Sequence, residues 1–208
     1  MTDLKIIKPF GPSIVKITMP EELVNKLNDY VDKIIVNKDK VSKLDHSAKL
    51  AGKVKQEFLL ENEFMQEIKW GEFLGRAVKT WVQHDLNKQL KTFQIIKCWI
   101  VRQFENEYNP VHHHSGHVSG VGYLKVPKNL GIISDSKKVN EKGSLALIHG
   151  SVNLFSKSTY VIKPEVGDFY LFPNYLMHAV YPFSDTNEER RSISFNANLD
   201  DNSASYSS

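Results

Sequence analysis

The sequence has little of several features that mark particular classes of protein. Its 208 residues include a single cysteine, so an internal disulfide framework is excluded. No stretch approaches the roughly 20 consecutive apolar residues that a membrane-spanning helix needs. The first residues, MTDLKIIKPFGPSIV, lack the positive charge followed by an apolar run that marks a secretory signal. We therefore expect a soluble, cytoplasmic protein.

An excess of charge of one sign is also missing. Lys and Arg number 27 against 24 Asp and Glu, and the basic residues are interspersed with acidic ones. This balance does not favour a nucleic-acid partner. With 41% hydrophobic residues, the chain is long enough for one well-packed domain and short for two. We expect one domain over residues 1–208, with N-terminal strands and supporting helices in 1–90, a β core in 91–199 and a flexible tail in 200–208.

The N-terminal part reads mainly as helix. Two short apolar runs, at residues 4–7 and 13–18, predict strands because proline and glycine separate them. Pro20, followed by two glutamates and apolar residues at helical spacing, predicts a helix that reaches Ile34. A similar pattern predicts one longer helix over residues 62–88. The polar, lysine-rich residues 37–54 are expected to form a loop with at most one helical turn.

After Gln89 the pattern changes to short β runs divided by turn residues. The expected strands are 93–104, 118–126, 144–148, 159–162, 169–172, 178–181 and 192–199. Strands at this spacing, with no helices between them, indicate an antiparallel sandwich or jelly roll. The long helices would cover one face of it.

Histidines are concentrated in one segment, NPVHHHSGHVSGVGY at residues 109–123, which holds four of the eight. A strand places alternate side chains on one face, so His112 and His114 would project together, roughly 7 Å apart. Two such imidazoles are half of a metal site, and His178, in a later β run, offers a third. We interpret His113 and His117 as loop residues or as residues that orient a ligand. Chance clustering of histidines is the alternative interpretation.

The last strand, RRSISFN, carries a second pattern. Arg190 and Ser192 share one face with Ser194 and Asn196, and we expect this polar face to line a pocket. An inward Arg190 can hold a carboxylate with two parallel hydrogen bonds, which lysine cannot do. Tyr123 can add a hydrogen bond to the same carboxylate, or it can simply fill the strand. Arg191 points the other way and is expected to be solvated.

These motifs, in this order over about residues 96–199, resemble the Fe(II)- and 2-oxoglutarate-dependent dioxygenases, in particular their small stand-alone group similar to prolyl hydroxylases. The resemblance implies a double-stranded β-helix, a cupin-like jelly roll that is mainly β, with supporting N-terminal helices. It implies Fe(II), 2-oxoglutarate and O2, and hydroxylation of an unidentified substrate with decarboxylation of 2-oxoglutarate to succinate. By the same resemblance, His112 and His178 match iron ligands, Arg190 the arginine that binds the distal carboxylate of 2-oxoglutarate, and Tyr123 and Ser192 its helpers.

One position departs from the pattern of the enzymes of known activity. They have a carboxylate as third ligand, where this chain has His114. Three neutral histidines leave the metal one negative charge short. Three carboxylates are candidates to substitute as the third ligand, but none has the matching spacing: Glu105, Glu107, Asp168.

Two alternative functions therefore stay open. One is a three-histidine cupin-type dioxygenase that uses no 2-oxoglutarate, and the other is a non-catalytic jelly-roll binding module. The sequence does not specify the primary substrate, which can be a protein residue, an amino acid or a metabolite, nor the oligomeric state. We expect substrate specificity to lie in loops such as residues 37–54 and 128–143.

Overall fold

Most strands of the chain belong to one large antiparallel sheet. The computed structural model describes residues 4–7, 11–131 and 140–200. Within them, seven strands form this sheet, and each neighbouring pair is antiparallel. Their order is β1 (Leu4–Ile7), β2 (Ile14–Thr18), β9 (Asp168–Pro173), β6 (Val118–Lys125), β11 (Arg190–Leu199), β4 (Phe93–Gln103) and β3 (Gln56–Leu59).

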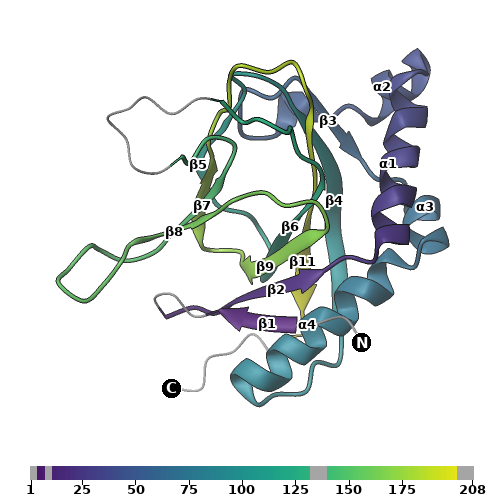
Figure 1. The fold of residues 1–208 in the computed structure, drawn as a ribbon. Coiled ribbons are helices and arrows are strands. Elements are labelled where there is room, and N and C mark those ends of the chain that lie inside the picture. The colour runs from purple at the N-terminus through teal and green to yellow at the C-terminus, as the bar shows by residue number, and fades with distance from the viewer. Residues whose placement is uncertain (1–3, 8–10, 132–139, 201–208) are drawn as a thin grey trace.

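A second, four-stranded antiparallel sheet lies against it (Figure 1). Its order is β5 (Asn109–His112), β10 (Met177–Val180), β7 (Leu145–Ile148) and β8 (Thr159–Ile162). Apolar side chains from both sheets, such as Tyr123 and Phe172 from the larger and Leu147 from the smaller, share one buried cluster. Two facing antiparallel sheets with this connectivity form a double-stranded β-helix, so the predicted fold class is confirmed.

Helices cover the outer face of the larger sheet, as Figure 1 shows. They are α1 (Glu21–Ile35), α2 (Lys38–Leu44), α3 (Asn62–Glu67) and α4 (Trp70–Leu86), with a 3-10 turn at Ser47–Lys49. Buried residues of α1 and α4, such as Leu27 and Val78, pack in one cluster with Ile193 and Phe195 of β11. The alternation of β11 therefore sends its apolar side chains to the helices and its polar ones to the interior between the sheets.

Several local predictions were wrong. The helix expected over residues 62–88 is two helices, because Lys69 adopts a left-handed backbone conformation with φ 54°. The expected loop at 37–54 contains α2, whose first turn is capped by Asn37: its Oδ1 accepts hydrogen bonds of 3.1 Å from the amides of Asp39 and Lys40. Strand β3 was not expected, and the strand expected to carry both His112 and His114 ends at His112. Most of the predicted tail (201–208) and part of the predicted specificity loop (132–139) lie outside the described residues.

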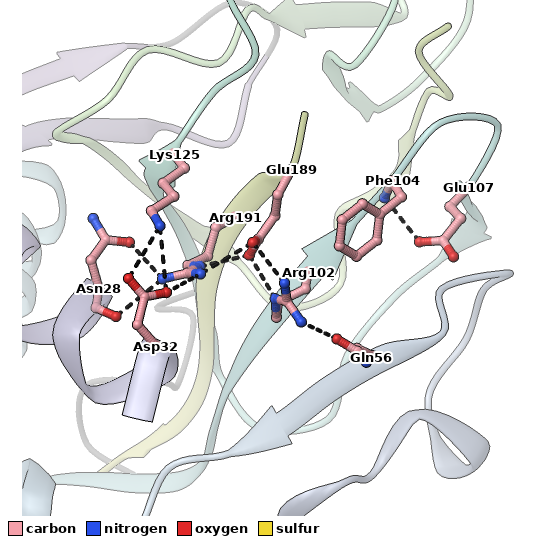
Figure 2. A network of polar contacts seen from close by, with 9 residues as sticks. All are labelled: Asn28, Asp32, Gln56, Arg102, Phe104, Glu107, Lys125, Glu189 and Arg191. Carbon is pink, nitrogen blue, oxygen red and sulfur yellow. Dashed lines mark hydrogen bonds and ion pairs between the residues drawn. The ribbon is translucent and has the colours of Figure 1, made fainter. Parts of the chain in front are cut away.

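A charged network joins α1 to the start of β11 (Figure 2). Arg191, expected to be solvated, is fully buried: it donates to Asp32 Oδ1 at 2.7 Å and to the backbone oxygen of Asn28 at 3.1 Å. Glu189 accepts from both Arg191 and Arg102. Burial raises the pKa of Glu189, but these hydrogen bonds outweigh it and the net shift is downward. The prediction for Arg191 was wrong because α1 supplies a partner from far away in the sequence.

No helix in the described part of the chain combines the length and the apolar character needed to cross a membrane.

Candidate active site

Three histidines meet at the edge of the smaller sheet. His112 on β5 lies directly opposite His178 on β10 in the strand register, and His114 follows β5 by two residues. Their ring centroids are 4.3 to 5.1 Å apart, and one nitrogen of each ring lies within 4.8 Å of the others. The strand pairing thus brings together the three histidines that the sequence singled out.

Two of these imidazoles are oriented by backbone carbonyl groups. His112 Nδ1 lies 2.7 Å from the carbonyl oxygen of Pro110, and His178 Nδ1 lies 2.9 Å from that of Leu176. A carbonyl oxygen can only accept, so each Nδ1 carries the proton and each Nε2 keeps its lone pair. A hydrogen bond on the distal nitrogen is the usual way in which a protein fixes a metal-binding histidine.

The third imidazole is oriented by a side-chain relay. His114 Nδ1 lies 3.1 Å from Ser119 Oγ, and Ser119 donates its own proton to Asn196 Oδ1 at 2.9 Å. The serine oxygen therefore accepts from His114, which again leaves Nε2 unprotonated. Asn196 lies on the same face of β11 as Arg190, so the strand that was predicted to line the pocket also supports a ligand.

Burial keeps these histidines neutral. Loss of solvation lowers the pKa of His114 to about 3 and that of His178 to about 4, and it also lowers the pKa of His112. Near neutral pH all three rings therefore offer a lone pair without first losing a proton.

Arg190 forms the other end of the site. It is 1% exposed, and only its Nη1 is paired, with Gln103 Oε1 at 3.0 Å. Its guanidinium carbon lies 5.0 Å from the centre of the Tyr123 ring. Within the described structure, Arg190 Nε and Nη2 and the Tyr123 hydroxyl have no hydrogen-bond partner. Burying a cation whose donors are unpaired costs folding free energy. These atoms are therefore suited to bind an anionic ligand, which would pair with them.

One cavity of about 50 Å³ connects the two ends. Its walls include the three histidines together with Arg190, Ser192 and Ser194 of β11. Ser192, predicted as a helper, is 2% exposed and faces this space. These residues suit Fe(II) and 2-oxoglutarate, the two groups that the sequence resemblance implies. Neutral imidazoles bind a divalent transition metal, and the forked guanidinium group binds a carboxylate.

Comparison with known families agrees with this chemistry. A family model described as "Putative 2OG-Fe(II) oxygenase" matches residues 97–196, the span from β4 to β11 that carries every residue of the site named so far. These residues belong to the 2OG-Fe(II) oxygenase family. Oxygenases of this family work with Fe(II), 2-oxoglutarate and O2, so the predicted family, enzyme class and cofactors are confirmed.

Solved structures show the same oxygenase fold. A Pseudomonas putida prolyl-4-hydroxylase matches with a TM-score of 0.58 at 14% identity, covering 88% of this chain and 91% of that one. HygX from Streptomyces hygroscopicus, solved with nickel and 2-oxoglutarate bound, matches with a TM-score of 0.57 at 11% identity, covering 89% and 82%. AviO1 from Streptomyces viridochromogenes matches with a TM-score of 0.57 at 11% identity, covering 95% and 93%. No curated protein sequence matches the chain.

Other residues that the sequence suggested as possible ligands or ligand supports have different roles in this oxygenase. His117 Nδ1 accepts from the amide of Leu199 at 2.9 Å and so fastens the loop to the end of β11. Glu107 accepts from the amide of Phe104, and Asp168 pairs with a lysine of β2 at 2.6 Å. Neither carboxylate, nor Glu105, joins the described metal-competent group, which consists of the three histidines.

Sequence reasoning missed two residues of the oxygenase site. Gln103, which pairs with Arg190, ends β4 directly opposite that arginine, but an amide at a strand end carries no distinctive signal. Glu57 lines the same cavity from β3, a strand that was not expected. The four residues QEFL show no polar–apolar alternation, so this short run gave no sequence signal for an inward carboxylate.

Proposed function

We propose that His112, His114 and His178 hold the Fe(II) of this oxygenase, and that Arg190, with Tyr123 and Ser192, binds the distal carboxylate of 2-oxoglutarate. The observation that carries this assignment is that one cavity holds both a group of metal-binding nitrogens and a set of unpaired donors for a carboxylate. At one end, one ring nitrogen from each of three neutral imidazoles lies within 4.8 Å of the other two, and at the other end stands a buried arginine with two unpaired donor nitrogens. A ligand that chelates a metal and carries a distal carboxylate satisfies both.

The residues of the chain have distinct tasks in this proposal. The hydrogen bonds on the three Nδ1 atoms fix the rings before metal arrives, which lowers the entropic cost of binding. Arg190 and Tyr123 fix the position and orientation of the co-substrate, and the apolar cavity walls exclude bulk water. When bound, Fe(II) and 2-oxoglutarate supply the oxidising chemistry, in which O2 is consumed, succinate and CO2 are formed and a C–H bond of the substrate is hydroxylated.

The histidine at the third position supports a second candidate, a three-histidine dioxygenase that uses no 2-oxoglutarate. His114 brings no charge, so the metal keeps one more positive charge than in a site with a carboxylate ligand. The unpaired Arg190 argues against this candidate, since such an enzyme has no need for a buried carboxylate receptor in the same cavity.

A succinate assay separates the two. The purified protein is supplied with Fe(II), 2-oxoglutarate and O2, and succinate is quantified. We expect slow formation of succinate even without the primary substrate, and its loss in His178→Ala and in Arg190→Met. Oxidation chemistry with iron and O2 that never yields succinate would instead support the three-histidine candidate.

We also propose that the chain acts as one domain, as the sequence suggested. The buried cluster shared by α1, α4 and the larger sheet supports this, because neither part covers its apolar face alone.

A further inference from the structure

Glu57 is a buried acid that the proposed chemistry does not use. It lies on β3, is 2% exposed and lines the cavity that also contains His112 and His114. Its neighbour Phe58 points the other way and packs on Ile34 of α1. The alternation of the strand therefore directs the Glu57 side chain into the interior of the β-helix.

The carboxylate of Glu57 is unpaired. None of the described residues donates a hydrogen bond to it or forms an ion pair with it. The charged groups that influence it from neighbouring elements are Lys97, Asp45 and Glu107, and burial is the main cause that raises its pKa to about 8. An unpaired buried carboxylate is costly for a protein to keep, which points to a ligand that completes it.

The register of the larger sheet separates Glu57 from the co-substrate end. Arg190 lies beside Gln103 on one side of β4, and Glu57 lies beside Val101 on the other. Two strand spacings across the sheet and an offset of two residues along it put the backbones of Arg190 and Glu57 about 12 Å apart. The cavity thus has a cationic wall, which the proposed function assigns to 2-oxoglutarate, and an acidic wall at the Glu57 carboxyl group, which is left for the other ligand.

An aromatic ring completes this acidic wall. Trp99 lines the cavity and lies opposite Leu59 in the register of β3 and β4. The centroid of its ring lies 5.5 Å from that of the His114 ring. The chain's own Lys97 ammonium lies 5.7 Å from the centre of the Trp99 ring, so this wall already attracts a cation. A carboxylate beside an indole is a combination that recognises ammonium and guanidinium groups.

We propose that Glu57 and Trp99 form a subsite for a cationic nitrogen of the primary substrate. The substrate class is then an amine or guanidine, either a small metabolite or the side chain of lysine or arginine. This inference rests on the proposed function, because it takes the Arg190 end as occupied by 2-oxoglutarate. The arriving cation favours the ionised form of Glu57, so neutral and anionic analogues bind less well.

The test uses n-butylammonium and its neutral analogue n-butanol as probes. Each is titrated calorimetrically into the full-length protein holding Fe(II) and 2-oxoglutarate without O2. We expect n-butylammonium to bind at least 10-fold more tightly than n-butanol to the wild type. Glu57→Gln keeps the shape of the side chain and should remove this preference. The matched variant Lys97→Met removes a positive charge that repels the ammonium group of the probe, and it should strengthen n-butylammonium binding.

Two results would overturn the proposal. One is the absence of a preference for the cation in the wild type, and the other is an equal preference in Glu57→Gln with its fold verified by circular dichroism. In the second case, weaker Fe(II) binding by Glu57→Gln would show that Glu57 serves the charge of the metal centre. Failure of the proposed function is recognised separately and before any probe is added, because the protein then neither binds 2-oxoglutarate in the presence of Fe(II) nor forms succinate.

Discussion

Replacement of Arg190 by methionine tests the co-substrate end of the site. Methionine has a similar length and no charge, so the variant removes the guanidinium while filling much of its space. Among the described residues, Arg190 has one hydrogen-bond partner, Gln103, and two donor nitrogens without a partner. The substitution therefore removes an uncompensated buried charge, and we expect the free energy of unfolding of the empty protein to stay the same or to rise.

The affinity for 2-oxoglutarate should fall steeply. Truncation of one partner of a buried, hydrogen-bonded charge pair costs about 2–5 kcal/mol, which corresponds to roughly 30-fold to several thousand-fold in the dissociation constant. Metal affinity should change little, because none of the imidazole hydrogen bonds involves Arg190. Arg190→Lys keeps the charge but loses the fork, so its affinity should lie between those of the wild type and Arg190→Met.

The assay is calorimetric titration of 2-oxoglutarate into the Fe(II)-loaded protein without O2, with metal affinity measured separately. Arg191→Met is the matched control, since it removes the same group from the opposite face of β11. That variant removes one of the two basic partners of both Glu189, which keeps Arg102, and Asp32, which keeps Lys125. It should lose about 1–3 kcal/mol of stability, while its affinity for 2-oxoglutarate changes little. An Arg190→Met protein with wild-type affinity for 2-oxoglutarate would refute the reasoning.

Three further predictions concern the metal centre and the buried acid. His178→Ala should fail to retain Fe(II) in a metal analysis after desalting, and full occupancy would show that His178 is not a ligand. Ser119→Ala removes the acceptor that fixes His114 and should weaken metal binding by about 10-fold to 100-fold in a competition titration, whereas an unchanged affinity would mean that the relay is dispensable. The native pKa of Glu57, about 8, exceeds its ordinary value of 4.5, so ionisation disfavours the native state increasingly as the pH rises between these values. Relative to Glu57→Gln, the wild type should therefore lose stability by up to about 1.4 kcal/mol per pH unit between pH 6 and pH 8 in urea unfolding, and parallel stability curves would contradict this.

Much of the β core could be predicted from the sequence, because it depends on local alternation. The polar and apolar sides of RRSISFN assigned Arg190 to the interior and Phe195 to the helical layer, as the structure shows. Turn residues marked most strand boundaries within one or two residues. The convergence of His112 and His114 with His178 followed from the motif order of the family, since no local pattern states that β5 pairs with β10.

The features that were missed depend on partners distant in the sequence. Lys69 breaks the expected long helix without a proline or glycine at that position, and the break lets Trp70 become fully buried. Strand β3 is only four residues long and is defined by its pairing with β4. The local sequence around Arg191 predicts a surface residue, because its partner Asp32 on α1 is distant in the sequence. The carbonyl groups that orient His112 and His178 have no signature in any sequence, because every residue has one.

The central claim is that one cavity holds Fe(II) on three histidines and 2-oxoglutarate on Arg190. Its most direct test is to add Fe(II) to the protein without O2 and then titrate 2-oxoglutarate, recording the visible metal-to-ligand charge-transfer band of the chelate. We predict a band that grows to saturation in the wild type and is absent from Arg190→Met at the same concentrations. Iron that binds but gives no band with 2-oxoglutarate would contradict the account.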